Sequence, residues 1–114
     1  MIEDLEARTS KPNWDDAGAA PIPRSLWAKA RGLSQEVGRA LPRLPAPFFS
    51  PSADGTVVVS WTISKTREVC VEIERDPSAH YAWLMCDTDG LFEHGWTVSA
   101  AGVVEILTIC GAPA

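Results

Sequence analysis

Apolar residues between positions 24 and 41 recur at intervals of three or four, which is the period of an amphipathic helix. Pro23 suits the first turn of such a helix, where its missing N–H group would have no partner. Pro42 disfavours helical geometry at the residue before it and so marks the end. We therefore predict a helix of about four to five turns between these prolines. The residues expected on its buried face are Leu26, Ala30, Leu33, Val37 and Leu41.

The period changes to two after residue 55, as expected for strands that bury one face. Residues 56–63 and 68–74 alternate strictly around a short turn sequence and predict an antiparallel hairpin. Residues 80–87 predict a third strand, and residues 91–98 predict either a short fourth strand or an irregular return. The residues expected on the buried face of the hairpin are Val57, Val59, Trp61, Ile63, Val69, Val71 and Ile73. In the third strand, Tyr81, Trp83 and Met85 lie on one side and Ala82, Leu84 and Cys86 on the other.

The segment 99–110 is open to two interpretations. Ser99 is a good N-cap residue, and apolar residues follow it at helical spacing. The rival interpretation is a last strand, because Val, Ile and Thr favour pleated surfaces. We favour the helix. Its apolar stripe would consist of Val103, Ile106, Leu107 and Cys110.

Two segments lack a sustained period. Residues 1–12 are expected to be a mobile leader, with at most a frayed helical turn over residues 3–8. Residues 41–55 contain four prolines and predict an extended connector, in which Phe48 and Phe49 contact the core. Residues 13–114 would then form one domain. The order of one helix, three to four antiparallel strands and a short helix predicts an α+β fold, a two-layer sandwich with both helices on one face of a meander.

Composition excludes several classes of protein. Of the 114 residues, 46% are hydrophobic and 22% are charged, as in ordinary globular domains. No apolar run approaches the roughly 18 residues that cross a bilayer, and residues 1–11 lack the apolar core of a signal peptide. We therefore expect a cytoplasmic protein that does not contact membranes. The net charge of −5 argues against nucleic-acid binding, which depends on neutralising phosphates.

The three cysteines, Cys70, Cys86 and Cys110, are widely spaced and have apolar or β-branched neighbours. Their odd number argues against a disulfide framework, and no C-x-x-C pair suggests a zinc or redox site. We expect three buried thiols that pack as small hydrophobic residues. No cofactor is predicted.

The strongest candidate for metal binding lies between residues 87 and 94. Asp87, Asp89, Glu93 and His94 could gather around a divalent cation. A calcium loop that begins at Asp87 would need a glutamate at its twelfth position, which is Val98. We therefore favour a polar turn, in which the aspartates cap backbone groups, and predict no metal site.

Motifs of catalysis are missing from the sequence. The chain has no G-x-S-x-G, H-E-x-x-H, P-loop or G-x-G-x-x-G pattern. A nucleophile pair such as Cys86 with His94 is available, but the cysteines lack the basic neighbours that lower the pKa of a thiol. We expect a non-catalytic protein without catalytic residues. A small metal-dependent enzyme or nuclease accessory factor that uses residues 87–94 is the alternative.

Two features suggest contact with another protein. The helix surface opposite Leu33 and Val37 carries a surplus of Arg and Lys. It is either a solvated face or a docking surface for an acidic partner protein or for RNA. The chain also has five tryptophans, and an exposed pair on one face of the sheet would form a binding patch. A homodimer is left open. The candidate partner-binding residues are Arg24, Arg31, Arg39, Trp83 and Trp96.

The segment NWDDAGAAP, residues 13–21, precedes the predicted helix, and DGTVVVSW follows the connector. These segments resemble a group of small bacterial and phage-borne proteins, which share N-W-D-G-Y-G-A-x-P before the first helix and D-G-x-x-x-x-x-W before a strand. Asp16 and Ala17 replace the Gly-Tyr of that pattern. The resemblance implies a mobile-element setting but no activity. Within it, we expect an inhibitor, immunity protein or antitoxin-like factor that binds a partner protein.

Residues 13–21 also have a structural interpretation. Trp14 can cover the open end of the core. Asp15 or Asp16 can accept backbone N–H groups within the loop or lie near the positive N-terminal end of the helix. The small residues Gly18, Ala19 and Ala20 let the chain pass close to the sheet. We predict that this segment anchors the chain.

Overall fold

The computed structural model describes residues 2–15, 17–74, 81–87, 92–97 and 99–113. Within these residues the chain forms three helices and five strands. The helices are α1 (Ile2–Thr9), α2 (Arg24–Ala40) and α3 (Ala100–Ile109). The strands are β1 (Phe48–Pro51), β2 (Val57–Thr62), β3 (Arg67–Ile73), β4 (Tyr81–Asp87) and β5 (Phe92–Thr97). None of the described helices is long and apolar enough to cross a membrane.

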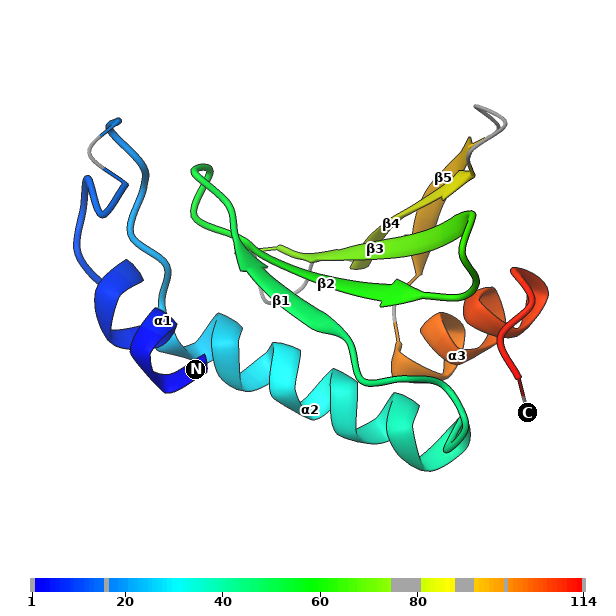
Figure 1. Cartoon of the computed structure of the whole chain (residues 1–114). Coiled ribbons are helices and arrows are strands. Elements are labelled where there is room, and N and C mark those ends of the chain that lie inside the picture. The colour runs from blue at the N-terminus through cyan, green and yellow to red at the C-terminus, as the bar shows by residue number, and fades with distance from the viewer. Residues whose placement is uncertain (1, 16, 75–80, 88–91, 98, 114) are drawn as a thin grey trace.

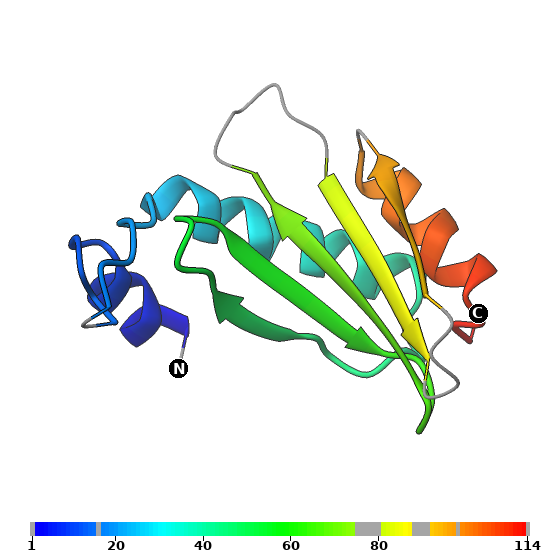
Figure 2. The ribbon, with the colours of Figure 1, turned by 90° about the horizontal axis from the view of Figure 1, so that it is seen from above.

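The strands form one antiparallel meander in the order β1-β2-β3-β4-β5, so each pairs with its neighbours along the chain. Helices α2 and α3 lie on one side of this sheet, and α1 lies beside the start of α2 (Figure 1). Seen from above, α2 passes behind the strands (Figure 2). The predicted α+β class is confirmed. The sheet has five strands, however, where the sequence predicts three to four.

The additional strand is β1, within the segment predicted as a connector. Phe48 pairs with Ser60, and Pro51 pairs with Val57. Because neighbouring side chains of a strand point to opposite faces, Phe49 packs against the core whereas Phe48 is 73% exposed. The prediction that both phenylalanines contact the core is therefore wrong for Phe48. The proline content hides this strand from the sequence pattern, and an edge position tolerates Pro51.

The core lies between the helices and the face of the sheet that we call the inner face. All five residues predicted for the buried face of α2 are buried, and Trp27 beside them is fully covered. The C-terminal helix is also confirmed, since the Ser99 hydroxyl accepts the Gly102 N–H at 3.1 Å and Val103 and Leu107 are fully buried. The sheet contributes six residues that are at most 1% exposed, namely Val57, Val59, Trp61, Val69, Val71 and Ile73.

The N-terminal segment differs from its prediction as a mobile leader. Residues Ile2–Thr9 form helix α1, and Leu5 packs against the core. The Thr9 hydroxyl donates to the Leu5 carbonyl at 2.6 Å and accepts the indole N–H of Trp27 at 3.1 Å. Thr9 is 1% exposed, so this contact lies in the interior. Helix α1 therefore contributes directly to the core around α2.

Candidate protein-binding surface

The outer face of the sheet is the face turned away from α2 and α3. Val59, Val71 and Met85 are buried on the inner face, so the residues next to them in each strand point outward. Figure 2 looks onto the outer face, and none of the described helices crosses it. The described side chains of the outer face are Phe48, Ser50, Val58, Ser60, Thr62, Glu68, Cys70, Glu72, Ala82, Leu84, Cys86, His94 and Trp96.

Large apolar side chains are exposed on the outer face. Trp96 is 63% exposed and Leu84 is 38% exposed. Ala82 is the cross-strand partner of Trp96, and Val58 lies in the same row of the sheet. A shallow hollow of about 340 Å³ lies beside Val58, Ala82 and Leu84. An antiparallel sheet with one solvated face usually carries polar residues there, so this apolar surface calls for a functional explanation.

Acidic residues follow the central strand across the same face. Glu68 and Glu72 point outward from β3, and the Thr56 hydroxyl donates to Glu72 Oε2 at 2.7 Å. Burial and the charge of Glu72 raise the pKa of Glu74, which follows the strand directly. No Lys or Arg belongs to the outer face among the residues that the structure describes. The outer face is therefore both apolar and negatively charged.

The three thiols occupy different environments. Cys110 is 6% exposed in the core, as predicted. Cys70 is half-buried on the outer face, and Cys86 is exposed, so the prediction of three buried thiols is wrong for these two. They follow the outward alternation of β3 and β4, which the prediction did not apply to them. Burial raises the pKa of the Cys70 thiol, whose sulfur accepts the Ser60 hydroxyl at 3.4 Å.

The two tryptophans named as partner-binding candidates lie on opposite faces of the sheet. Trp83 pairs with Val71 and with Gly95, whereas Trp96 pairs with Ala82. A Cβ atom at Gly95 would lie 3.0 Å from the indole of Trp83, so the glycine makes room for this ring on the inner face. Trp83 packs against the core, and the two side chains do not form a shared aromatic patch. Of the two, only Trp96 lies on the outer face.

The basic candidates of α2 divide into two groups. Arg31 forms an ion pair with Glu6 of α1 and thereby joins the two helices. Arg24 and Arg39 are exposed. Both belong to α2, which packs against the inner face of the sheet and not on the outer face (Figure 1). Their role in partner binding stays a prediction.

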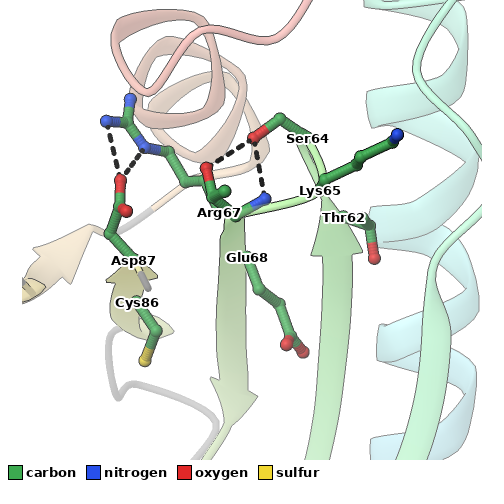
Figure 3. A pocket seen from close by; sticks show the side chains of 8 residues that line it. Thr62, Ser64, Lys65, Arg67, Glu68, Cys86 and Asp87 are labelled. Carbon is green, nitrogen blue, oxygen red and sulfur yellow. Dashed lines mark hydrogen bonds and ion pairs between the residues drawn. The ribbon is translucent and has the colours of Figure 1, made fainter. Parts of the chain in front are cut away.

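Asp87, the first of the residues considered for metal binding, is engaged by Arg67. The Arg67 guanidinium donates to Asp87 Oδ2 from Nε at 3.2 Å and from Nη2 at 3.1 Å (Figure 3). Its Nη1 donates to the Cys110 carbonyl at 2.8 Å, at the C-terminal end of α3. A positive charge is stabilising at the C-terminal end of a helix, because the helix dipole is negative there. Arg67 therefore joins β3, β4 and α3, and a pocket of about 300 Å³ lies beside it.

The other candidate ligands do not converge in the described structure. Glu93 and His94 are neighbours in β5, so their side chains leave opposite faces of the sheet. Asp89 and the turn predicted around it lie outside the described residues. Among the residues that are described, no group of three His, Cys, Asp or Glu side chains could hold a metal ion.

The segment of residues 13–21 forms a loop whose side chains bond its own backbone. The Trp14 indole N–H donates to the Ala20 carbonyl at 2.7 Å, and the ring packs against the core. Asp15 Oδ1 accepts the N–H groups of Ala17 and Ala19 at 2.9 and 3.0 Å. These contacts confirm the prediction that Trp14 covers the core and that an aspartate accepts backbone N–H groups.

Backbone conformation explains two further residues of this loop. Gly18 has a φ of 84°, a conformation that glycine adopts at low cost. A Cβ atom at this position would have no neighbour within 4 Å, so the prediction of a close approach to the sheet is wrong for Gly18. Asn13 has a φ of 58°, and its side-chain oxygen accepts the Gly18 N–H at 2.6 Å. Asparagine tolerates this left-handed conformation better than most residues. Asp16 lies outside the described residues. The loop is thus a structural anchor between α1 and α2.

Comparison of the chain with protein-family models, with curated proteins and with solved structures found no match. The interpretation of the outer face therefore depends on its own geometry and chemistry.

Proposed function

We propose that this protein is a small non-catalytic interaction module that binds a partner protein through the outer face of its sheet. The observation that carries the proposal is the exposure of Trp96, Leu84 and Phe48 on a five-stranded surface over which no described helix packs. Aromatic side chains are enriched at the centres of protein interfaces, where they supply much of the binding energy. Exposed apolar patches of this kind often mark the site at which another protein binds.

The resemblance of residues 13–21 to phage-borne proteins supports a more specific setting. In it, the module acts in a phage or mobile element as an inhibitor, immunity protein or antitoxin-like factor. Trp14 and Asp15 bond the backbone of their own loop and so anchor the chain. This structural role is compatible with the setting, because the loop that carries the resemblance need not be the surface that binds a partner. The sheet supplies a rigid platform for that surface.

The proposal is tested by capturing partners from native lysate with the tagged full-length chain. We expect one stoichiometric partner with the natural chain and its loss with the double variant Trp96→Ser and Leu84→Ser. Ile109→Ser is the matched control, because Ile109 is 75% exposed on α3, away from the outer face. The proposal is contradicted if the double variant still captures the partner. It is also contradicted if Ile109→Ser abolishes capture to the same extent.

A further inference from the structure

We infer that the partner presents a basic amphipathic helix to the outer face. The apolar stripe of that helix covers Trp96, Leu84 and Ala82. Its Lys or Arg residues, on the flank above β3, pair with Glu68 and Glu72. This inference rests on the proposed function and adds the chemistry of the partner.

The distribution of charge is the first argument. Glu68 and Glu72 give the outer face a negative charge, and its described residues include no cation. Lys65, in the turn between β2 and β3, lines a pocket together with Glu68 at one end of the face. Arg67 instead turns toward the C-terminal end of α3, and Arg24 is exposed on α2. Interfaces pair opposite potentials, which speeds association and excludes partners of the wrong charge. A basic partner therefore fits this face.

The position of the acidic strand argues against a second copy as the occupant. Strand β3 is the central strand of five. Two copies that packed outer face to outer face about a two-fold axis through the centre of the sheet would place β3 over β3. Glu68 and Glu72 would then face the same residues of the partner copy, with no Lys or Arg among the described outward residues of the strands. Burying like charges together is costly, so a different protein is the better occupant.

The dimensions of the outer face suit one helix. Adjacent strands lie about 4.8 Å apart, so β3 and β5 are separated by roughly 10 Å, the width of a helix with its side chains. A helix that lies along β4 contacts Ala82 and Leu84 below it and Trp96 on one side. Its other side lies above β3, where the glutamates are.

The spacing of the glutamates gives the expected pattern of cations. Glu68 and Glu72 are four residues apart in one strand, which corresponds to about 13 Å. A helix rises about 1.5 Å per residue, so cations seven or eight positions apart are separated by about 10–12 Å. The partner helix should therefore carry Lys or Arg at positions i and i+7 or i+8, beside a stripe of Leu, Ile or Met.

Synthetic peptides test this chemistry directly. The probe is an amphipathic peptide of about 18 residues with a leucine stripe flanked by lysines, a length that supports a helix on binding. One control peptide replaces every lysine with glutamate, and the other has the same composition in scrambled order. We expect the basic peptide to shift the indole N–H signal of Trp96 in NMR spectra. It should bind at least about ten-fold more tightly than either control.

Variants of the full chain assign this binding to the two glutamates. Glu68→Gln and Glu72→Gln should each weaken binding of the basic peptide about three-fold, as expected for one exposed ion pair. The difference should shrink as salt rises from about 20 to about 200 mM. Glu36→Gln and Glu105→Gln are matched controls, because both residues are exposed on the helices. Equal binding of the glutamate peptide or the scrambled peptide overturns the inference, as does a peptide footprint on α2.

The partner captured in the lysate experiment separates failure of the inference from failure of the proposed function. Capture that requires Trp96 but resists both Glu68→Gln and Glu72→Gln refutes the basic helix and leaves the proposed function standing. Capture that does not require Trp96 refutes the proposed function itself. A dimer in sedimentation equilibrium that Trp96→Ser dissociates would identify a second copy as the occupant and overturn the inference.

Discussion

Replacing Trp14 by alanine should destabilise the protein strongly, although Trp14 lies in a loop. Its ring packs against the core, and its indole N–H donates to the Ala20 carbonyl at 2.7 Å. Truncation removes both contacts and leaves the end of the core near α1 uncovered. Trp14→Phe provides a finer test, because phenylalanine keeps an aromatic ring but cannot donate to Ala20.

The expected size of the effect follows from area and hydrogen bonding. A tryptophan of this kind buries about 150 Å² or more, worth roughly 4 kcal/mol at about 25 cal/mol per Å². Measured truncations of core tryptophans cost about 3–5 kcal/mol. For a chain of 114 residues, one kcal/mol corresponds to a change of about 4 °C in melting temperature. We therefore expect losses of about 12–20 °C for Trp14→Ala and about 4–8 °C for Trp14→Phe, which loses one hydrogen bond.

Thermal unfolding followed by circular dichroism measures these changes. Trp96→Ala is the matched control, since Trp96 is 63% exposed and its truncation should cost no more than about 2 kcal/mol. If Trp14→Ala melts within about 2 °C of the natural protein, the indole is not an anchor, and the structural interpretation of residues 13–21 fails.

Three further predictions concern the interior and its ionisable groups. Thr9→Val keeps the shape of the side chain but leaves the buried indole N–H of Trp27 without its acceptor. Urea unfolding should therefore show a free energy of unfolding lower by about 1–3 kcal/mol. An unchanged urea midpoint would contradict the docking of α1. Gly95→Ala places a Cβ atom 3.0 Å from the indole of Trp83 and should cost about 1–3 kcal/mol, a penalty that Trp83→Leu should relieve in the double variant. Burial raises the pKa of Tyr81 above its ordinary value of 10.0, so the unfolded chain loses this proton at a lower pH than the folded chain. The free energy of unfolding should therefore fall as pH rises above 10. Urea titrations of Tyr81→Phe should show a shallower fall.

Hydrophobic periodicity predicted the elements whose side chains meet the core. The stripe from Leu26 to Leu41 and the alternation around Trp61 are strong patterns, because burial requires apolar residues at those positions and at few others. The helix after Ser99 was predictable from its cap despite β-branched residues. Each of these patterns arises from burial or capping that involves residues close together in the sequence, so the pattern alone is enough to predict the element.

The elements that the sequence missed depend on contacts between distant residues. Helix α1 is stabilised by Thr9 and its bond to Trp27, eighteen residues away, and the pattern of residues 1–12 contains no sign of that partner. Strand β1 depends on pairing with β2, while its prolines suggest a connector. The opposite orientations of Trp83 and Trp96 follow from the register that pairs Trp83 with Gly95, which neither residue reveals alone.

The inner face of the sheet supports stability, and we propose that the outer face supports recognition, so the two roles can be tested separately. Val59, Val71 and the other inner residues hold the helices, so changes to them alter folding and binding together. Trp96, Leu84 and Glu68 are exposed, so changes to them alter the free energy of unfolding far less. We propose that they contact another protein, and loss of binding in a Trp96 variant whose melting temperature is unchanged would report that contact directly.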